Sequence, residues 1–339
     1  MSAWPPAPDS SLGLLVIFAC GLGSAALCRW ALAYSKRRGL LDAPGRRRSH
    51  AVSTPRGGGV GFVAVSVVLA LAVLPFGPLQ WALVGGLLAV AGIGWLDDHR
   101  PLSSGLRLAV HVLAAAALVL ALQGWPVDLP SILKAGVSLL AVVTLLNFWN
   151  FMDGINGLAS LQAILTAGLY AGLALAAGLP TLALLMLGLA AAVAGFLPYN
   201  LPQARMFMGD VGSGALGFLL AAFALLLLPA MVEPWLLLLP LAPMATDAGL
   251  TLLMRMALGR RWYAAHREHL YQWWVRCGAS HTRVTLAYAL FSLLVVLPSM
   301  MLALDRPDLR LPLTLGVYAF AAALWLWARA RLLRGARTW

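Results

Sequence analysis

The sequence predicts an all-α integral membrane protein with about eleven transmembrane helices. Apolar residues make up 61% of the 339 positions and charged residues only 11%, whereas a soluble domain is nearer half apolar and a quarter charged. Runs of about 18–24 residues without a charge recur along the chain, and this is the length of a helix that crosses a bilayer. Basic residues gather between alternate runs. Together these features exclude a soluble globular protein and a disordered chain.

The chain is expected to form a single polytopic domain over 1–339. The expected spans lie near residues 12–34, 57–76, 79–96, 106–123, 131–151, 157–178, 179–198, 211–231, 235–258, 284–304 and 311–330. The run over 157–198 is nearly continuous, and we divide it at Gly178-Leu179-Pro180 because Gly and Pro permit a tight turn. Without that division the count would be ten.

The distribution of charge predicts the orientation. The formal net charge is +12, from 24 Lys and Arg against 12 Asp and Glu. In an eleven-span arrangement twenty of the 24 basic residues fall on one side, and only Lys134, Arg306 and Arg310 fall clearly on the other. The positive-inside rule then places the N-terminus outside and the C-terminus in the cytoplasm. The expected cytoplasmic segments are the loops near 35–56, 97–106, 151–157, 199–211 and 259–283 and the basic tail 329–339. No Lys or Arg precedes Arg29, so no signal peptide is expected.

Four acidic residues, Asp97, Asp98, Asp153 and Asp210, fall at the cytoplasmic ends of spans and come from three loops. Carboxylates so close to the hydrocarbon are costly unless they are paired, hydrated or bound to a metal. Their placement predicts one active site assembled from several cytoplasmic loops. The adjacent pair Asp97-Asp98 suits Mg²⁺, which usually takes one or two carboxylates together with substrate phosphates. A solvated helix end paired with Arg100 explains this pair equally well.

Amide and acid side chains gather around Asp153 in the segment NFWNFMDGING, residues 147–157. Asn147, Asn150 and Asp153 follow one another at intervals of three, which can place them on one helical face. Asn156 lies just beyond. Polar contacts between helices are the structural alternative.

The segment MGDVGSG places Asp210 before a Gly- and Ser-rich helix start. Such an Asp could hold a metal while the helix N–H groups face a phosphate, although an ordinary N-cap explains the motif alone better. In the loop 259–283, His266 and His269 are spaced to face one ligand, and no Cys or third His completes a convincing zinc set. An anionic substrate is the expected partner, with a basic loop on anionic lipid as the alternative. His111 and Asp247 are ionisable groups inside spans, either functional or structural.

The Gly run after Thr54-Pro55-Arg56 permits close backbone approach to a ligand or another helix. The order of five motifs, TPRGGG, the Asp pair, NxxNxxDGxxG, MGDxGS and the late His loop, resembles the polyprenyl-phosphate N-acetylhexosamine-1-phosphate transferase superfamily, glycosyltransferase family 4. The resemblance extends from about Arg46 to about Gln272. The segments HREHLYQ and FMDGING are most similar to those of the O-antigen-initiating bacterial branch (WecA/WbpL-like).

Three positions depart from the family pattern. Many members carry a second Asp where this chain has Asn156, so we assign Asn156 to nucleotide contact rather than to metal. The peptidoglycan branch has a Lys where this chain has Pro101. It also has three successive histidines where this chain has only His266 and His269. A pentapeptide substrate is therefore not expected.

The resemblance implies that the phosphate of undecaprenyl phosphate attacks the β-phosphorus of a UDP-N-acetylhexosamine, which yields polyprenyl-diphosphate-sugar and UMP. It implies a bacterial inner-membrane enzyme, with its site on the cytoplasmic face, that starts a cell-surface polysaccharide such as the O-antigen of lipopolysaccharide. Membrane lipid is a further expected partner, nucleic acid is not, and a homodimer is left open.

The same resemblance assigns roles to the motif residues. Asp210 is the expected main Mg²⁺ ligand, with Asp153 in support and Mn²⁺ as a substitute ion. Asp97 and Asp98 are expected to handle the lipid phosphate, one of them as a general base. The remaining expected contacts are Asn147, Asn150 and Asn156 to nucleotide or metal-bound water, His266, Arg267 and His269 to the diphosphate, and Arg56 with Arg46–Arg48 as attractors of the anionic substrates.

Three alternatives remain. A covalent aspartyl intermediate is a formal variant of the mechanism. A polyprenyl diphosphate phosphatase would release inorganic phosphate rather than UMP. A transporter of an anionic substrate predicts charges near the bilayer midplane, where only His111 and Asp247 approach that depth.

Overall fold

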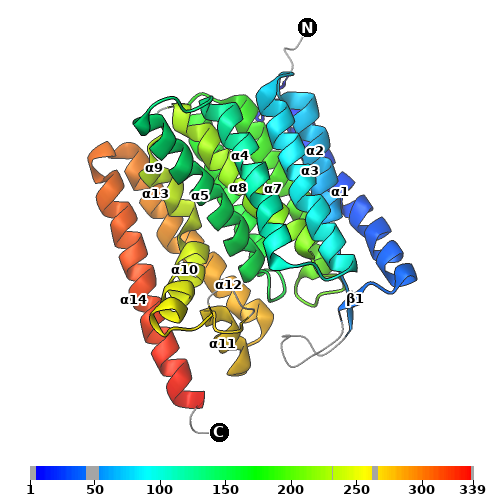
Figure 1. Ribbon diagram of the computed structural model, residues 1–339, viewed down its shortest axis with the longest axis vertical. Helices are drawn as coiled ribbons and strands as arrows, with labels where there is room; N and C mark the ends of the chain where they lie inside the picture. Colours follow the sequence, from blue (N-terminus) through cyan, green and yellow to red (C-terminus); the bar gives the residue numbers. More distant parts are fainter. Residues whose placement is uncertain (1–4, 43–52, 231, 262–265, 337–339) are drawn as a thin grey trace.

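A computed structural model describes residues 5–42, 53–230, 232–261 and 266–336. Its helices run side by side as one bundle (Figure 1). Within the described residues, ten helical segments are long and apolar enough to cross a membrane. The all-α membrane fold is therefore confirmed, and the chain is a multi-pass membrane protein. The first six of these helices are α1 (Ser11–Arg38), α3 (Pro78–His99), α4 (Ser104–Gln123), α5 (Leu129–Met152), α6 (Leu158–Ala176) and α7 (Pro180–Asn200).

The last four spans are composite. The first is α8 (Asp210–Leu227) with η1 (Leu228–Ala230), and the second is α9 (Pro234–Leu238) with η2 (Leu239–Leu241) and α10 (Ala242–Ala257). The third is α12 (His281–Phe291) with η3 (Ser292–Val296) and α13 (Leu297–Asp305). The fourth is η4 (Pro307–Leu309) with α14 (Arg310–Ala336). Proline accounts for one interruption directly. Pro298 has no N–H for the carbonyl of Leu294, and the turn that contains Leu294 is a π-helix.

The span expected near 57–76 is shorter than predicted. Helix α2 (Val60–Val73) has 14 residues, which is about 21 Å against a hydrocarbon core of about 30 Å. Glycines 57–59 precede it, and Pro75 and Gly77 follow it, so neither end can extend as regular helix. Figure 1 nevertheless shows the two termini at opposite ends of the bundle, as an odd number of crossings requires. That α2 is the eleventh crossing, and which end of the bundle faces the cytoplasm, stay predictions.

The division of the apolar run 157–198 is confirmed. Helix α6 ends at Ala176, and α7 begins at Pro180. Between them Gly178 has φ +70°, a left-handed conformation that glycine adopts without strain. The turn therefore depends on the glycine and the proline from which the sequence predicted it.

A two-stranded antiparallel hairpin follows α1 at the lower end of the bundle in Figure 1. Strand β1 (Leu41–Asp42) pairs with β2 (Thr54–Pro55). The chain after β2 continues alongside the segment before α8, where the amides of Gly58 and Gly59 donate to the carbonyls of Phe207 and Met208 at 3.0 and 2.9 Å. This pairing fixes Arg56 beside the start of α8. The cluster Arg46–Arg48 lies outside the described residues.

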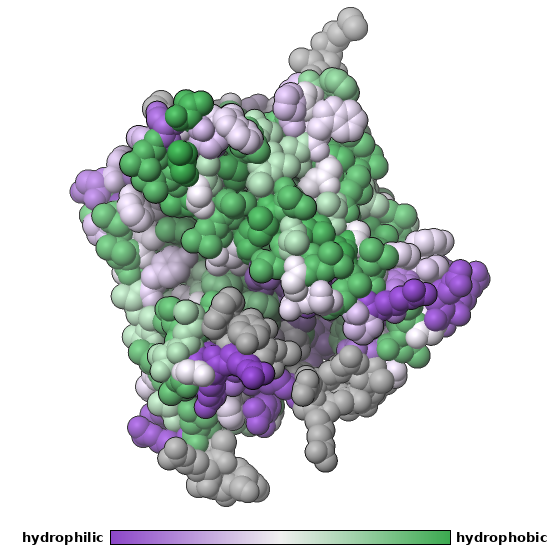
Figure 2. Space-filling view, in the orientation of Figure 1, coloured by the Kyte–Doolittle hydropathy of each residue, from purple (hydrophilic) through white to green (hydrophobic). Residues whose placement is uncertain are grey.

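Helix α8 is the centre of the bundle. Of its most apolar 18-residue stretch 89% is buried, against 17% for α5, which lipid must cover instead. Close packing around α8 depends on glycine, because a Cβ on Gly217 would lie 2.5 Å from the Cα of Leu146 in α5. Figure 2 shows apolar residues across the face formed by α3, α4 and α5, and hydrophilic residues mainly at the lower end. The polar end of the bundle therefore coincides with the start of its most buried helix.

Candidate active site

A polar cavity of about 210 Å³ lies where α3 ends, α5 ends and α8 begins. It is lined by Asp42, Arg56, Asp98, Asn150, Asp153, Gly154, Ile155, Asn156, Asn200, Phe207, Gly209, Asp210, Gln272 and His281. Six residues singled out in the sequence are therefore brought together here, from four separate motifs. They are Arg56, Asp98, Asn150, Asp153, Asn156 and Asp210.

Asp98 binds the start of α8. Its carboxylate accepts the backbone N–H groups of Asp210 and Val211 at 3.2 and 3.3 Å, and it is 4% exposed. A carboxylate at a helix N-terminus is stabilised by the unpaired N–H groups and by the helix dipole. Arg56 Nη1 lies 3.8 Å from the same carboxylate. Asp98 therefore ties α3, α8 and the segment after β2 into one rigid wall of the cavity.

Arg107 joins two of the acid motifs. Its Nη1 atom lies 2.5 Å from Asp210 Oδ2 and 3.1 Å from Asp97 Oδ2. The other oxygen of Asp97 accepts the N–H of Leu102 at 2.6 Å, which orders the turn between α3 and α4. Asp97 itself is absent from the cavity lining. Arg107 is one of the basic residues expected on the cytoplasmic side, and no local feature of the sequence separates it from the others.

Asn150 supports Asp210 from the opposite side. Its Nδ2 donates to Asp210 Oδ1 at 3.2 Å and to Ser213 Oγ at 2.8 Å. Asn147, one turn earlier on α5, instead donates to the carbonyl of Val143 at 2.7 Å and lies outside the cavity lining. The three-residue spacing therefore brings Asn150 and Asp153 to the site but leaves Asn147 short of it.

Asp153 is the carboxylate that most needs a cation. Burial raises the pKa of its carboxyl group well above the usual range, and the negative charges of Asp210 and Asp98 raise this pKa further. Within the described residues, no group of three or more His, Cys, Asp or Glu side chains is placed to hold a metal ion. Two carboxylates in a polar cavity still fit Mg²⁺, which takes its remaining ligands from water and substrate phosphates.

Residues that lie outside the sequence motifs hold the loop between α5 and α6 in place. Asn200 Oδ1 accepts the N–H of Gly157 at 2.7 Å, and its Nδ2 donates to the carbonyl of Met206 at 3.1 Å. His281 Nδ1 accepts the N–H of Asn156 at 3.3 Å. Asn156 Nδ2 donates to the carbonyl of Pro202 at 3.1 Å. These contacts fix the floor beside Asp153, and no local motif marks Asn200 or His281 in the sequence.

The late histidines lie outside the polar cavity. His266, Arg267 and His269 are absent from its lining. His269 is 3% exposed, and its Nδ1 atom is 3.9 Å from Asp247 Oδ1. Burial, together with the nearby groups His269 and Arg255, lowers the pKa of the His266 imidazole to about 4. His266 is therefore neutral near pH 7, and in this arrangement it can offer a ligand a hydrogen bond but no charge.

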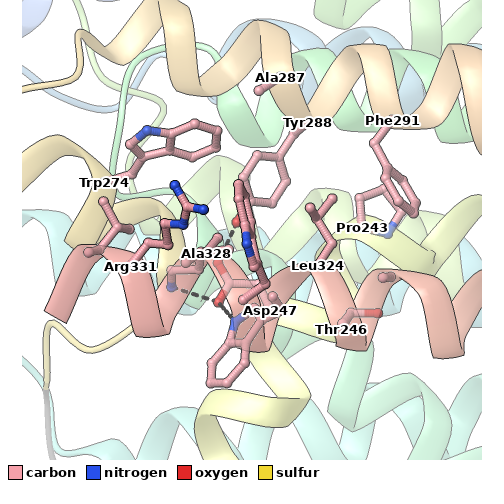
Figure 3. Close-up of a pocket in the computed structure, with 15 residues that line it drawn as sticks. Pro243, Thr246, Asp247, Trp274, Ala287, Tyr288, Phe291, Leu324, Ala328 and Arg331 are labelled. Atoms are coloured by element: carbon pink, nitrogen blue, oxygen red, sulfur yellow. Dashed lines mark hydrogen bonds between the residues drawn. The ribbon is translucent and has the colours of Figure 1, made fainter. Parts of the chain in front are cut away.

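Asp247 explains where this loop sits. Its buried carboxylate accepts hydrogen bonds from the amides of Leu270 and Tyr271, the hydroxyls of Thr251 and Tyr288, and the indole of Trp325, at 2.7–3.3 Å. Several of these bonds are dashed in Figure 3. The donors belong to α10, α12, α14 and α11 (Leu270–Arg276). A buried carboxylate that accepts five hydrogen bonds has a structural role. The transporter alternative therefore loses Asp247 as one of its two candidate charges near the bilayer midplane.

The loop reaches the polar cavity through the residues after His269. The Tyr271 hydroxyl donates to the carbonyl of Phe151 at 2.9 Å, and Gln272 lines the cavity. A Cβ on Gly154 would lie 2.1 Å from the Tyr271 hydroxyl oxygen, so this glycine permits the contact. Asp247 thus positions the wall beside Asp153 indirectly, through Tyr271.

Replacing Asp247 with alanine should lower the stability of the folded protein by at least about 3 kcal/mol, because several buried donors lose their acceptor. Thermal unfolding in detergent, followed by size-exclusion chromatography, measures this as a lower midpoint. Asp308→Ala is the matched control, since Asp308 is exposed and pairs with Arg306 at the surface. A midpoint for Asp247→Ala equal to that of Asp308→Ala would show that the cluster contributes nothing.

Comparison with known proteins identifies the family. The family profile of Glycosyl transferase family 4 matches residues 80–228, a stretch that contains all four clustered acids. A phospho-N-acetylmuramoyl-pentapeptide-transferase from Synechococcus sp. (strain JA-3-3Ab) is 36% identical over 238 residues, which are 63% of this chain and 67% of that relative. The chain belongs to glycosyl transferase family 4. The polyprenyl-phosphate hexosamine-1-phosphate transferase superfamily predicted from the motif order is thereby confirmed.

Other members of glycosyl transferase family 4 resemble the chain over different lengths. A phospho-N-acetylmuramoyl-pentapeptide-transferase from Synechococcus elongatus is 39% identical over 196 residues, 51% of this chain and 53% of the relative, so the chain spans about half the length of that protein. A decaprenyl-phosphate N-acetylglucosaminephosphotransferase from Mycobacterium tuberculosis is 29% identical over 295 residues, 74% and 73% of the two chains. The names of these relatives differ in the sugar, so family membership alone does not select a substrate.

Proposed function

We propose that this protein transfers N-acetylhexosamine-1-phosphate from a UDP-N-acetylhexosamine to undecaprenyl phosphate and releases UMP. The observation that carries the proposal is the convergence of Asp98, Asp153 and Asp210 with Arg56 at one polar cavity at the end of a membrane bundle. Phosphoryl transfer depends mostly on positioning and on charge neutralisation. A cavity with both signs of charge beside the lipid boundary meets both needs for a reaction between two anions.

The proposed reaction is a single displacement. An oxygen of the lipid phosphate bonds to the β-phosphorus of the donor, the bond from that phosphorus to the bridging oxygen breaks, and UMP leaves with the electron pair. The nucleophile needs little help from a base, because a phosphate monoester with a second pKa of about 6 is mostly deprotonated at pH 7. Asp97 and Asp98 contribute instead through the arginines they hold. Asp97 orients Arg107 and Asp98 lies beside Arg56, and these cations would attract the two anionic substrates.

Asp210 and Asp153 are the residues we propose to hold Mg²⁺, with Mn²⁺ as a substitute. Bound there, the ion would reduce the negative charge that opposes attack by an anionic nucleophile. Asn150 orients the Asp210 carboxylate. Asn156, Gln272 and His281 also line the cavity and are the proposed contacts to the nucleotide.

The finer assignments rest on sequence patterns. The excess of basic residues at the site end of the bundle supports a cytoplasmic face in a bacterial inner membrane. The segments HREHLYQ and FMDGING support a place in the O-antigen-initiating branch, and therefore a first membrane step in lipopolysaccharide synthesis.

The direct assay combines the purified protein with undecaprenyl phosphate, Mg²⁺ and one UDP-N-acetylhexosamine at a time, and detects UMP by chromatography. UMP that requires both the lipid and Mg²⁺, and that EDTA suppresses, is the expected result, and the responding donor identifies the sugar. Inorganic phosphate in place of UMP would instead support the phosphatase alternative.

Metal affinity should depend on pH through Asp153. Because the pKa of its carboxyl group is raised, a bound proton competes with the ion, and metal binding releases that proton. The apparent dissociation constant for Mn²⁺, measured by electron paramagnetic resonance, should therefore fall as pH rises. Asp153→Asn should bind Mn²⁺ more weakly and lose most of this slope. An unchanged slope in that variant would assign the proton to another group.

Replacing Arg107 with glutamine should weaken binding of the UDP-sugar, because Asp97 and Asp210 lose the cation between them. We expect the KM for the donor to rise about tenfold, while less Mg²⁺ is needed for half-saturation. Arg100→Gln is the control, because Arg100 is an exposed cation near the same end of α3. Equal effects of the two substitutions would show that Arg107 has no specific role in substrate binding.

A further inference from the structure

A second cavity, of about 310 Å³, lies between α10, α11, α12 and α14. Aromatic rings form much of its wall, as Figure 3 shows. These are the side chains of Trp274, Tyr288, Phe291, Trp325 and Trp327. The wall shares no residue with the polar cavity. It is therefore separate from the polar cavity at which we place the transfer reaction.

The cavity is elongated along α14. Its wall includes Ala321, Leu324, Trp325, Ala328, Arg331 and Leu332, which repeat at helical spacing on one face of that helix. Eleven residue steps correspond to about 16 Å along the axis. The polar atoms of Asp247 at its base are already occupied by five hydrogen bonds. A long apolar space of this kind fits a hydrocarbon chain rather than a polar or cationic ligand.

One cation stands at the polar end of this space. Arg331 is exposed, and its guanidinium carbon lies 5.0 Å from the centroid of the Trp327 ring. In Figure 3 its side chain lies beside Trp274, at the end of the row formed by Leu324 and Ala328. No carboxylate pairs with Arg331 in the part of the chain that the structure describes. An arginine stacked on a tryptophan near the end of a membrane helix is placed to meet a lipid headgroup.

We propose that this cavity binds one acyl chain of an anionic phospholipid, with the lipid phosphate at Arg331. The acyl chain would restore packing contacts along the apolar wall of the cavity. The phosphate would pair with the unpaired guanidinium. The lipid thereby braces α14 against the Asp247 cluster. The polyprenyl substrate is a poorer occupant, because Arg331 is not part of the polar cavity, so a phosphate bound at Arg331 would lie outside that cavity.

Retention of lipid by the purified protein tests this inference without any need for transferase activity. The protein is exchanged into micelles that contain equal amounts of phosphatidylglycerol and phosphatidylethanolamine, and native mass spectrometry counts the bound lipids. We expect one retained phosphatidylglycerol. Arg331→Gln should reduce the retained fraction about fivefold, and Ala328→Trp should abolish retention by filling the cavity.

Two substitutions on the same helix serve as matched controls. Arg334→Gln removes an exposed cation three residues further along, and Ala330→Trp adds the same indole at an exposed position outside the cavity wall. Both should retain phosphatidylglycerol as the wild type does. If Ala328→Trp fails to fold, Arg331→Gln decides the question alone. Equal retention of phosphatidylethanolamine, unchanged retention in Arg331→Gln, or displacement of phosphatidylglycerol by added undecaprenyl phosphate would each overturn the proposal.

Discussion

Replacing Asp210 with asparagine is expected to reduce UMP release by at least about 10³-fold while the protein stays folded. Asparagine keeps the shape of the side chain but removes the negative charge that we propose to hold Mg²⁺. The hydrogen bond from residue 210 to Asp98 uses the backbone N–H, so the substitution leaves the start of α8 in place. Turnover under saturating lipid and donor measures the effect.

The control for Asp210→Asn is Asp308→Asn, an isosteric change of an exposed acid in the turn before α14. Both variants should elute as the wild type does in size-exclusion chromatography and unfold at similar temperatures. Activity of Asp210→Asn within a factor of two or so of the Asp308→Asn value would exclude Asp210 as the principal metal ligand.

Replacing Gly94 with alanine is the second change expected to have a large effect. A Cβ at this position would lie 2.4 Å from the carbonyl carbon and oxygen of Asp210. These are backbone atoms of a buried helix start and cannot rotate away, so α3 must separate from α8. Overpacking of this kind costs about 1–3 kcal/mol, and a displacement of about 1 Å can reduce turnover about 100-fold.

Gly92→Ala is the matched control for Gly94→Ala. Gly92 lies on the same helix, two residues earlier, and a Cβ there meets nothing within 4 Å. This variant should have the activity of the wild type and, as alanine favours helix, equal or slightly higher stability. If Gly94→Ala and Gly92→Ala have the same turnover, the contact between α3 and α8 does not control the site.

The sequence predicted the convergence of the acids because span ends on one side of a bundle are close in space. That argument succeeded for Asp98, Asp153 and Asp210, which line one cavity. It could not assign Asp97, which faces Arg107 and the turn after α3. The role of Arg107 was hidden because nothing local separates it from the other basic residues.

The late histidine loop shows a different limit. Spacing placed His266 and His269 on one side of a short segment, but the position of that segment depends on Asp247, a residue about twenty positions earlier in another span. Only the tertiary structure shows that Gln272, rather than His266 or His269, lines the polar cavity, and that Tyr271 contacts the carbonyl of Phe151 beside it. The short length of α2 can be explained from the sequence, since the flanking glycines and Pro75 already limit the helix.

The most direct test of the proposed function follows the β-phosphorus of the donor. The protein is incubated with undecaprenyl phosphate, Mg²⁺ and the responding UDP-N-acetylhexosamine carrying ³²P at the β-position, and the products are separated into aqueous and butanol phases. Transfer of sugar-1-phosphate predicts that the label enters the lipid phase while unlabelled UMP accumulates in equal amount. Release of the label as free UDP in the aqueous phase, or as inorganic phosphate, would contradict the proposed reaction.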